Sequence, residues 1–180
     1  VQFTDYGVSG PAVFDIARAA VSAGSGAAVA LDLLPQLDEA ELLALLAARK
    51  QAGLTAENLL TGILHNKLGR TVVTLLGISL AAPVSGLAEG QLAAVARRVK
   101  RTVLPVTGSL GMEGAQVTAG GVSTAEFDEN TMRSRLVPGL YAAGEVLDID
   151  GDCGGYNLQW AWSSGRLAGR VLERGTAAEQ

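Results

Sequence analysis

The most informative segment of the sequence reads Gly139-Leu-Tyr-Ala-Ala-Gly-Glu-Val-Leu-Asp-Ile-Asp-Gly-Asp-Cys-Gly-Gly-Tyr-Asn-Leu-Gln-Trp-Ala-Trp-Ser-Ser-Gly165. An apolar strand is predicted over residues 140–143, and it runs into Gly144-Glu145. An acidic loop follows, and Gly154-Gly155 then opens a predicted helix. Open α/β sheets hold phosphate-bearing cofactors at junctions of this kind, at the carboxyl ends of their strands. The segment therefore indicates a cofactor site.

The composition is that of a folded protein. Of its 180 residues, 48% are hydrophobic and 18% are charged, which argues against disorder. This length suffices for one domain or for two small ones. The net charge of −4 gives no general attraction for nucleic acid. A cluster of bases is expected to be the solvated face of a helix, and no stacking aromatic residues interleave with it: Arg97, Arg98, Lys100 and Arg101.

The sequence carries no targeting or membrane signal, so a cytoplasmic protein is the expectation. It has no signal-peptide pattern and no apolar run long enough to span a bilayer. Cys153 is its single cysteine, so no internal disulfide is possible. The chain begins at Val1 without a methionine, and we expect it to be a piece of a longer polypeptide.

Hydrophobic periodicity predicts an α/β chain whose middle is helical. Asp38 and Glu41 have the spacing of a capping box, so a helix is expected after Asp38. The whole range 36–101 is predicted to be helical without strands, and residues 5–11 to be a turn-rich loop. Strands are expected over residues 1–4, 27–34, 102–107, 115–119 and 140–143, and further helices over residues 12–21, 55–64, 67–76, 89–101 and 156–174.

Two features of the segment 139–165 could bind a ligand. Free N–H groups at a helix N-terminus attract electron-rich oxygen, and the residues that follow Gly155 would supply them. The carboxylate of Glu145, at a strand end, can accept hydrogen bonds from a sugar or ribityl hydroxyl. Each feature also has a purely structural interpretation, as an ordinary loop–helix junction and as a surface acid.

Other chemistries fit the residues poorly. A calcium loop starting at Asp148 would need Gly at its sixth position and Glu at its twelfth, but Cys153 and Gln159 occupy these positions. Hydrolysis lacks a Gly-x-Ser-x-Gly elbow, and His65 is the only histidine, so the usual zinc ligands cannot be assembled either. Gly24-Ser-Gly26 precedes a strand and lacks the third glycine of a dinucleotide fingerprint, so it is read as a turn. Cys153 is either a redox thiol or a packed small residue.

Four segments, in this order, resemble the bacterial FAD-dependent oxidoreductases of the BaiN type. They are Phe3-Thr-Asp-Tyr-Gly-Val-Ser-Gly-Pro11, Leu31-Asp-Leu-Leu-Pro35, Ala115-Gln-Val-Thr-Ala-Gly-Gly-Val122, and Thr131-Met-Arg-Ser-Arg-Leu-Val-Pro138, which runs into the segment quoted first. The resemblance covers essentially the whole chain. It departs at Asp5, where the family pattern has His, and this leaves the role of that side chain open.

The resemblance implies the C-terminal part of a Rossmann-like FAD domain, an inserted helical unit and remnants of a small β-barrel. Residues 1–35 would end the barrel-like substrate domain, 36–101 would form the helical insert, 102–114 would return through the barrel, and 115–180 would complete the FAD-binding domain. The family's Gly-x-Gly-x-x-Gly and its ribose-binding acid would lie upstream. The expected partner is therefore the missing N-terminal half of the FAD domain.

The same resemblance implies roles for residues around FAD. Gly144 and Glu145 would approach the ribityl–pyrophosphate region, and a backbone wall by the ring would consist of Thr118, Ala119, Gly120 and Gly121. The helix end would border the pyrimidine side of the ring and stabilise the negative charge that grows there on reduction, through Gly154, Gly155, Tyr156, Asn157, Leu158 and Gln159. No catalytic side chain stands out, because the flavin would carry the chemistry.

The expected parent passes hydride between FAD and a nicotinamide, NADH or NADPH, or a small organic substrate. The alternative is a non-catalytic folded fragment or interaction module that binds no flavin on its own. The chain alone is expected to bind little FAD and to be inactive. Self-association is expected, since apolar surface meant for the missing half would be exposed. Nucleic acid and membrane are not expected as partners.

Overall fold

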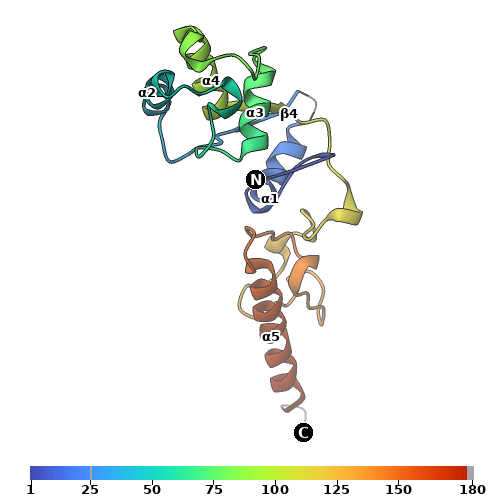
Figure 1. Ribbon diagram of the computed structural model, residues 1–180. Helices are drawn as coiled ribbons and strands as arrows, with labels where there is room; N and C mark the ends of the chain where they lie inside the picture. Colours follow the sequence, from blue (N-terminus) through green and yellow to red (C-terminus); the bar gives the residue numbers. More distant parts are fainter. Residues whose placement is uncertain (25, 178–180) are drawn as a thin grey trace. The chain divides into compact units, whose positions relative to one another are not determined.

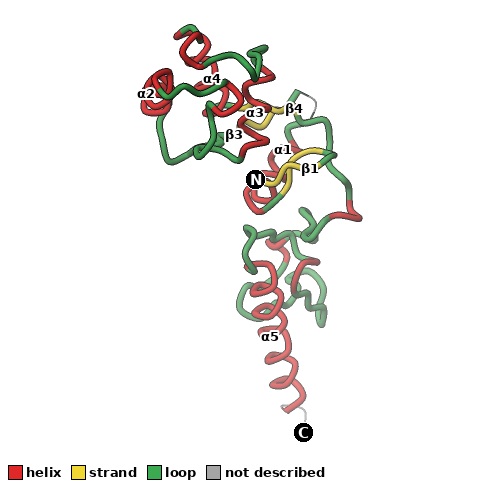
Figure 2. The backbone as a smooth tube through the Cα atoms, viewed as in Figure 1, coloured by secondary structure: helices red, strands yellow, loops and turns green. Residues whose placement is uncertain are grey.

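The computed structural model describes residues 1–24 and 26–177 and has a mixed α/β structure. Within these residues it contains five α-helices and two two-stranded antiparallel sheets (Figures 1 and 2). Internal contacts divide the chain into a terminal unit, Val1–Ser25 with Thr107–Gln180, and a helical unit, Gly26–Val106. The assignment of residue ranges to domains of a longer protein stays a prediction.

The helical unit combines three helices with one small sheet. Strand β3 (Ala28–Leu31) pairs antiparallel with β4 (Thr102–Pro105), so that Leu31 lies opposite Thr102. The helices are α2 (Glu39–Ala48), α3 (Asn66–Leu75) and α4 (Glu89–Lys100). Short 3-10 turns connect them at Arg49–Gln51, Ala56–Asn58 and Val84–Gly86.

One apolar core holds the helical unit together. The helix predicted over 89–101 is confirmed as α4, and Leu92, Val95, Ala96 and Val99, which follow one another at the spacing of one helix face, are all buried. The stripe packs in one cluster with buried residues of α2, α3 and the connecting turns: Leu42, Leu46, Leu59, Leu60, Val72 and Val73. The expected capping box is confirmed too, since Asp38 Oδ1 accepts from Glu41 N–H at 2.7 Å and Glu41 Oε2 accepts from Asp38 N–H at 2.8 Å.

Several basic side chains of the helical unit bind its own backbone carbonyls. Lys100 Nζ donates to the carbonyls of Leu34, at 2.9 Å, and Leu37, and it pairs with Asp32 at 2.7 Å. Its side chain is only 15% exposed, so the expectation of a fully solvated basic face is wrong at this residue. Two further bases close neighbouring turns: Arg49 Nη1 donates to Leu59 O and Thr61 O, and Lys50 Nζ donates to Leu87 O.

The terminal unit is built from the N-terminal and the C-terminal segments of the chain. Strands β1 (Gln2–Thr4) and β2 (Gly7–Ser9) form a hairpin, and α1 (Pro11–Ser22) follows with Pro11 at its start. Residues 107–155 are mainly loops with short 3-10 turns at Met112–Gly114, Thr124–Glu126 and Gly144–Val146. Helix α5 (Tyr156–Ala177) follows them. The small core of the terminal unit consists of Phe127, Met132, Leu147 and Ala168.

Some expected elements differ in the structure. The strands predicted over 115–119 and 140–143 are absent from the described residues. In the second range Tyr141 forms an isolated bridge with Arg133. The helix predicted over 55–64 is a 3-10 turn followed by turns, because Leu59 and Leu60 are buried within a bend that continues to Gly62 at φ +78°. The predicted loop 5–11 contains β2. Ser25, within the predicted Gly24–Gly26 turn, lies outside the described residues.

The two units differ in how much apolar surface they leave exposed. Among the described residues, the exposed large apolar side chains of the helical unit are Leu45, Leu75 and Val103. All others belong to the terminal unit, and they include Trp162 at 68% and Leu158 at 60%. The terminal unit therefore carries apolar faces that its own described residues do not cover. In the described part of the chain, no helix combines the length and hydropathy needed to cross a membrane.

Candidate functional site

Two of the predicted binding segments lie side by side in the terminal unit. Val122 N–H donates to Val146 O at 2.8 Å, and Asp148 N–H donates to Val122 O at 2.9 Å, in a parallel arrangement. A Cβ on Gly121 would lie 2.7 Å from Val146 O, which is closer than real Cβ contacts come. A residue without a side chain is therefore required for this pairing.

A carboxylate joins the same two segments. Glu145 Oε1 accepts a hydrogen bond of 2.6 Å from the backbone N–H of Thr118. The expected wall, Thr118 to Gly121, is thus tied to the expected ribityl-facing pair Gly144-Glu145. Sequence reasoning assigned Glu145 to a ligand hydroxyl, whereas its described partner is a backbone amide.

Helix α5 fixes the turn at Gly144. The backbone N–H of Gly144 donates to Ser164 Oγ at 2.9 Å, and its carbonyl accepts from Trp160 Nε1 at 3.0 Å. Gly144 has φ +75°, and a Cβ there would lie 3.6 Å from the Cβ of Ala161. Ser164 is fully buried. Sequence reasoning missed the roles of Ser164 and Trp160, although two runs of small residues, Ser163-Ser-Gly165 and Ala168-Gly169, are a signal that another segment can approach the helix closely.

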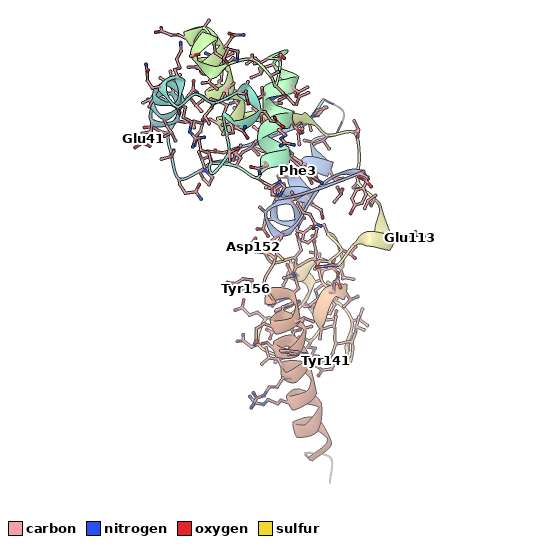
Figure 3. The ribbon with its side chains drawn as sticks, viewed as in Figure 1. Phe3, Glu41, Glu113, Tyr141, Asp152 and Tyr156 are labelled. Carbon is pink, nitrogen blue, oxygen red and sulfur yellow. The ribbon has the colours of Figure 1, made fainter. Side chains whose placement is uncertain are left out.

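Helix α5 begins at Tyr156, where the sequence predicts it, and its N-terminal end is open. Gly154 and Gly155 both have positive φ, +127° and +96°, and both are exposed. The first helical amides have no intrahelical acceptor, and the bond from Gln159 N–H to Gly155 O, at 3.0 Å, is the first of the ladder. Tyr156, Asn157 and Leu158 therefore contribute free-standing backbone donors to this end. Figure 3 shows Asp152 and Tyr156 at this end and Tyr141 farther along the helix.

Two predicted site residues use their side chains within the chain. Asn157 Oδ1 accepts from Gly151 N–H at 2.8 Å, and its Nδ2 donates to Gly151 O at 2.9 Å. Gln159 Nε2 donates to Ser163 Oγ at 3.0 Å. At Asn157 the group left for a ligand is the backbone N–H, which is the group that sequence reasoning had assigned. At Gln159 that expectation is wrong, because its backbone N–H already donates to Gly155 O within the helix.

Helix α1 contacts the acidic loop that leads into α5. Asp15 Oδ1 accepts from Cys153 N–H at 3.0 Å. Arg18 forms an ion pair with Asp150 and lies 3.9 Å from the Asp148 carboxylate. None of these contacts was anticipated from the sequence, because they join residues more than 120 positions apart.

A hydrogen-bonded carboxylate closes a neighbouring turn of the terminal unit. The hydroxyl of Thr131, 2.9 Å from Asp128 Oδ1, and the nearby backbone amides hold the pKa of Asp128 below its ordinary value. A shallow hollow beside this turn is lined by Asp128, Thr131, Arg133, Ser134 and Arg135. A second hollow lies in the helical unit, lined by Arg49, Ala52, Leu54, Asn58 and Thr61. Neither hollow is lined by a residue predicted to bind the cofactor.

The arrangement around α5 suits the ring side of a flavin. A glycine cradle and uncovered helix-end amides can receive electron-rich ring oxygens. A Cβ on Gly155 would meet nothing within 4 Å, whereas one on Gly154 would lie 3.8 Å from the Tyr156 ring, in ordinary van der Waals contact. These residues therefore fit one side of the flavin ring of FAD, the cofactor that the sequence resemblance implies.

Comparisons with known proteins place the chain in a family. Residues 46–171 match the family described as "HI0933-like protein Rossmann domain". The 3-dehydro-bile acid delta(4,6)-reductase of Clostridium scindens is 39% identical over 95% of this chain and 43% of its own length. The ribosomal RNA dihydrouridine synthases of Escherichia coli and Haemophilus influenzae are 37% and 35% identical, over 90% and 96% of this chain.

The chain spans only about two fifths of these curated relatives, namely 43%, 39% and 42% of their lengths. The family match nevertheless covers well over half of the chain and includes the open end of α5. The resemblance drawn from the four sequence segments is thereby confirmed. The chain belongs to the HI0933-like family of flavoproteins.

Proposed function

We propose that this chain is the C-terminal portion of an FAD-dependent oxidoreductase and forms the flavin-ring side of its FAD site. The observation that carries the proposal is the open N-terminal end of α5, where Gly154 and Gly155 take positive φ and leave the first helical amides uncovered. By the family resemblance, the range 115–180 would be the C-terminal part of a Rossmann-like FAD domain, completed by a missing N-terminal half. Residues 36–101 would be its helical insert, and 1–35 with 102–114 its barrel remnants.

The chain's residues would bind and orient the cofactor. The amides of Tyr156, Asn157 and Leu158 would hold ring oxygens, and the wall from Thr118 to Gly121 would bound the ring on a second side. Glu145 fastens this wall to the Gly144 turn, while Ser164 fastens the turn to α5. When bound, FAD supplies the hydride transfer, so no acid or base of the chain needs to be assigned.

We propose NAD(P)H as the electron source and a small organic molecule as the acceptor. One relative's name denotes a reductase of a bile acid, and the other names denote a dihydrouridine synthase acting on ribosomal RNA. The basic cluster supports the small molecule, because Lys100 is engaged with backbone carbonyls and no stacking aromatic residues interleave with Arg97, Arg98 and Arg101. A cytoplasmic location stays an expectation of the sequence.

The test is flavin binding by the full-length parent protein. We expect the purified parent to be yellow, and Gly155→Asp to lose most of the flavin absorbance. A carboxylate there would meet the ring oxygens and occupy the helix end itself. Gly155→Asn is the matched variant, since it has the same size without the charge and Asn tolerates positive φ better than most residues. Gly90→Asp, in the first turn of α4, controls for an added acid.

A colourless parent would overturn the proposal and favour a non-catalytic module. For the 180-residue chain alone, we expect little bound FAD, because by the family resemblance the adenosine-binding half would lie upstream of these residues. Equilibrium dialysis with FAD measures this directly.

A further inference from the structure

Helix α1 presents two polar side chains to one loop. Asp15 and Arg18 are three positions apart and lie on the same helix face. Asp15 accepts from the backbone N–H of Cys153, while Arg18 pairs with Asp150 and approaches Asp148. The two side chains thus hold the loop 148–153 at both of its ends.

These polar contacts connect α1 to the loop. None of the α1 side chains is buried, so packing in a core does not fix the helix. The loop in turn leads directly into Gly154 and Gly155, and glycine has more backbone freedom than any other residue. An anchored loop therefore limits the conformations from which α5 begins.

The charge of the loop also needs a partner. Asp148, Asp150 and Asp152 stand within five positions and precede the helix end that is proposed to receive electron-rich oxygen. Among the described residues, Arg18 is the cation that forms ion pairs with them. The guanidinium keeps this negative charge from competing with a ligand for the positive end of the α5 dipole.

We propose that Arg18 is a positioning residue of the flavin site, acting through Asp150 on the loop 148–153 and on the start of α5. The effect of Arg18 on flavin rests on the proposed function. The anchoring of the loop 148–153 by Arg18 does not, because it depends on the chain alone. The two parts can fail separately, so they are tested separately.

The first test is hydrogen exchange of the backbone amides of residues 148–156 in the 180-residue chain. Arg18→Gln is expected to raise their exchange rates roughly two- to fivefold, the range that corresponds to a partly exposed ion pair. Asp150→Asn should do the same, and the double variant should add nothing further. The charge swap Arg18→Asp with Asp150→Arg should restore slow exchange.

The control breaks an ion pair elsewhere. Arg70→Gln removes the 2.9 Å pair with Glu57 in the helical unit and should leave the exchange of the loop unchanged. Unchanged exchange of the loop in Arg18→Gln, or additive effects in the double variant, would overturn the proposal.

The second test uses the flavin-loaded parent. Arg18→Gln is expected to weaken FAD binding by several-fold and to shift the midpoint potential of the bound flavin to more negative values, since Asp148 and Asp150, which precede the start of α5, would lose their cation. Arg70→Gln should change neither quantity. If the loop exchanges faster but affinity and potential stay constant, the ion pair is only structural and the proposal is wrong. A colourless parent would instead sink the proposed function, while the exchange result would still stand or fall by itself.

Discussion

The buried hydroxyl of Ser164 accepts a hydrogen bond of 2.9 Å from the backbone N–H of Gly144. The same hydroxyl lies 2.7 Å from the carbonyl of Trp160, to which it donates. Trp160 Nε1 completes the arrangement by donating to Gly144 O. One turn of α5 therefore provides hydrogen-bond partners for both the N–H and the carbonyl of Gly144.

Ser164→Ala should destabilise the terminal unit by about 1–3 kcal/mol, because it leaves the Gly144 N–H buried without an acceptor. Urea unfolding followed by tryptophan fluorescence measures this, since the chain's 2 tryptophans, Trp160 and Trp162, both lie in α5. Ser163→Ala removes a hydroxyl from the exposed face of the same helix and should stay within about 0.5 kcal/mol of the parent chain. Equal losses in the two variants would contradict the role of Ser164.

Two glycine-to-alanine substitutions should change the free energy of unfolding in opposite directions. Gly121→Ala forces a methyl group to within 2.7 Å of a backbone carbonyl and should cost about 1–3 kcal/mol, with loss of the pairing to residues 146–148. Gly165→Ala meets open space within α5 and should stabilise the chain by about 0.5–1 kcal/mol through helix propensity. Fluorescence-detected unfolding reports both, and a neutral Gly121→Ala would mean that the two segments do not approach so closely.

Local signals in the sequence predicted local structure well. The Asp38–Glu41 box depends on residues three positions apart, and it forms as expected. The periodic stripes of α4 and the start of α5 at Tyr156 were also predicted correctly, since a helix satisfies its own backbone. These elements include the start of α5, although the binding roles assigned to its residues stay a prediction.

Elements that depend on distant partners were predicted less well. A strand needs a neighbour, and residues 115–119 find none among the described residues despite their β-prone sequence. The contact of Arg18 with Asp150 joins positions 132 apart, and no periodicity signals it. Lys100 looked like part of a solvated cluster, although the carbonyls of Leu34 and Leu37 draw it inward. In each case the missing information is which segments meet in space.

Lys100→Met should destabilise the helical unit by about 1–3 kcal/mol. The substitution keeps the apolar stem but leaves the carbonyl of Leu37 without the Lys100 donor and that of Leu34 with only the 3.3 Å bond from Leu37 N–H. Far-UV circular dichroism during urea unfolding is the measurement. Arg97→Met is the control, because Arg97 is 70% exposed, lies 3.9 Å from Glu39, and should contribute little. A loss in Arg97→Met as large as that in Lys100→Met would contradict an internal role for Lys100.

The helical unit should lose stability in acid through Asp32. Its hydrogen bond with Lys100, and that with the Leu34 amide, hold the pKa of Asp32 below its ordinary value. A carboxyl with a lowered pKa in the folded state contributes stability above the unfolded pKa of about 4, and this is lost as pH falls through the folded pKa. Asp32→Asn should therefore lower stability at pH 7 more than at pH 3. In a Lys100→Met background the same substitution should matter less, and an undiminished effect would assign the stabilisation elsewhere.

The chain is expected to associate through its uncovered apolar surface. Leu158 and Trp162 are four positions apart on α5, so they share a face, and both are mostly exposed. Exposed apolar surface of this kind gains free energy when a second molecule covers it. Light scattering over a range of concentrations should show a mass that rises with concentration, and Trp162→Glu should reduce this rise. Leu75→Glu, at a side chain of the helical unit that is 62% exposed, should have less effect. A monomer at every concentration would show that this surface does not drive association.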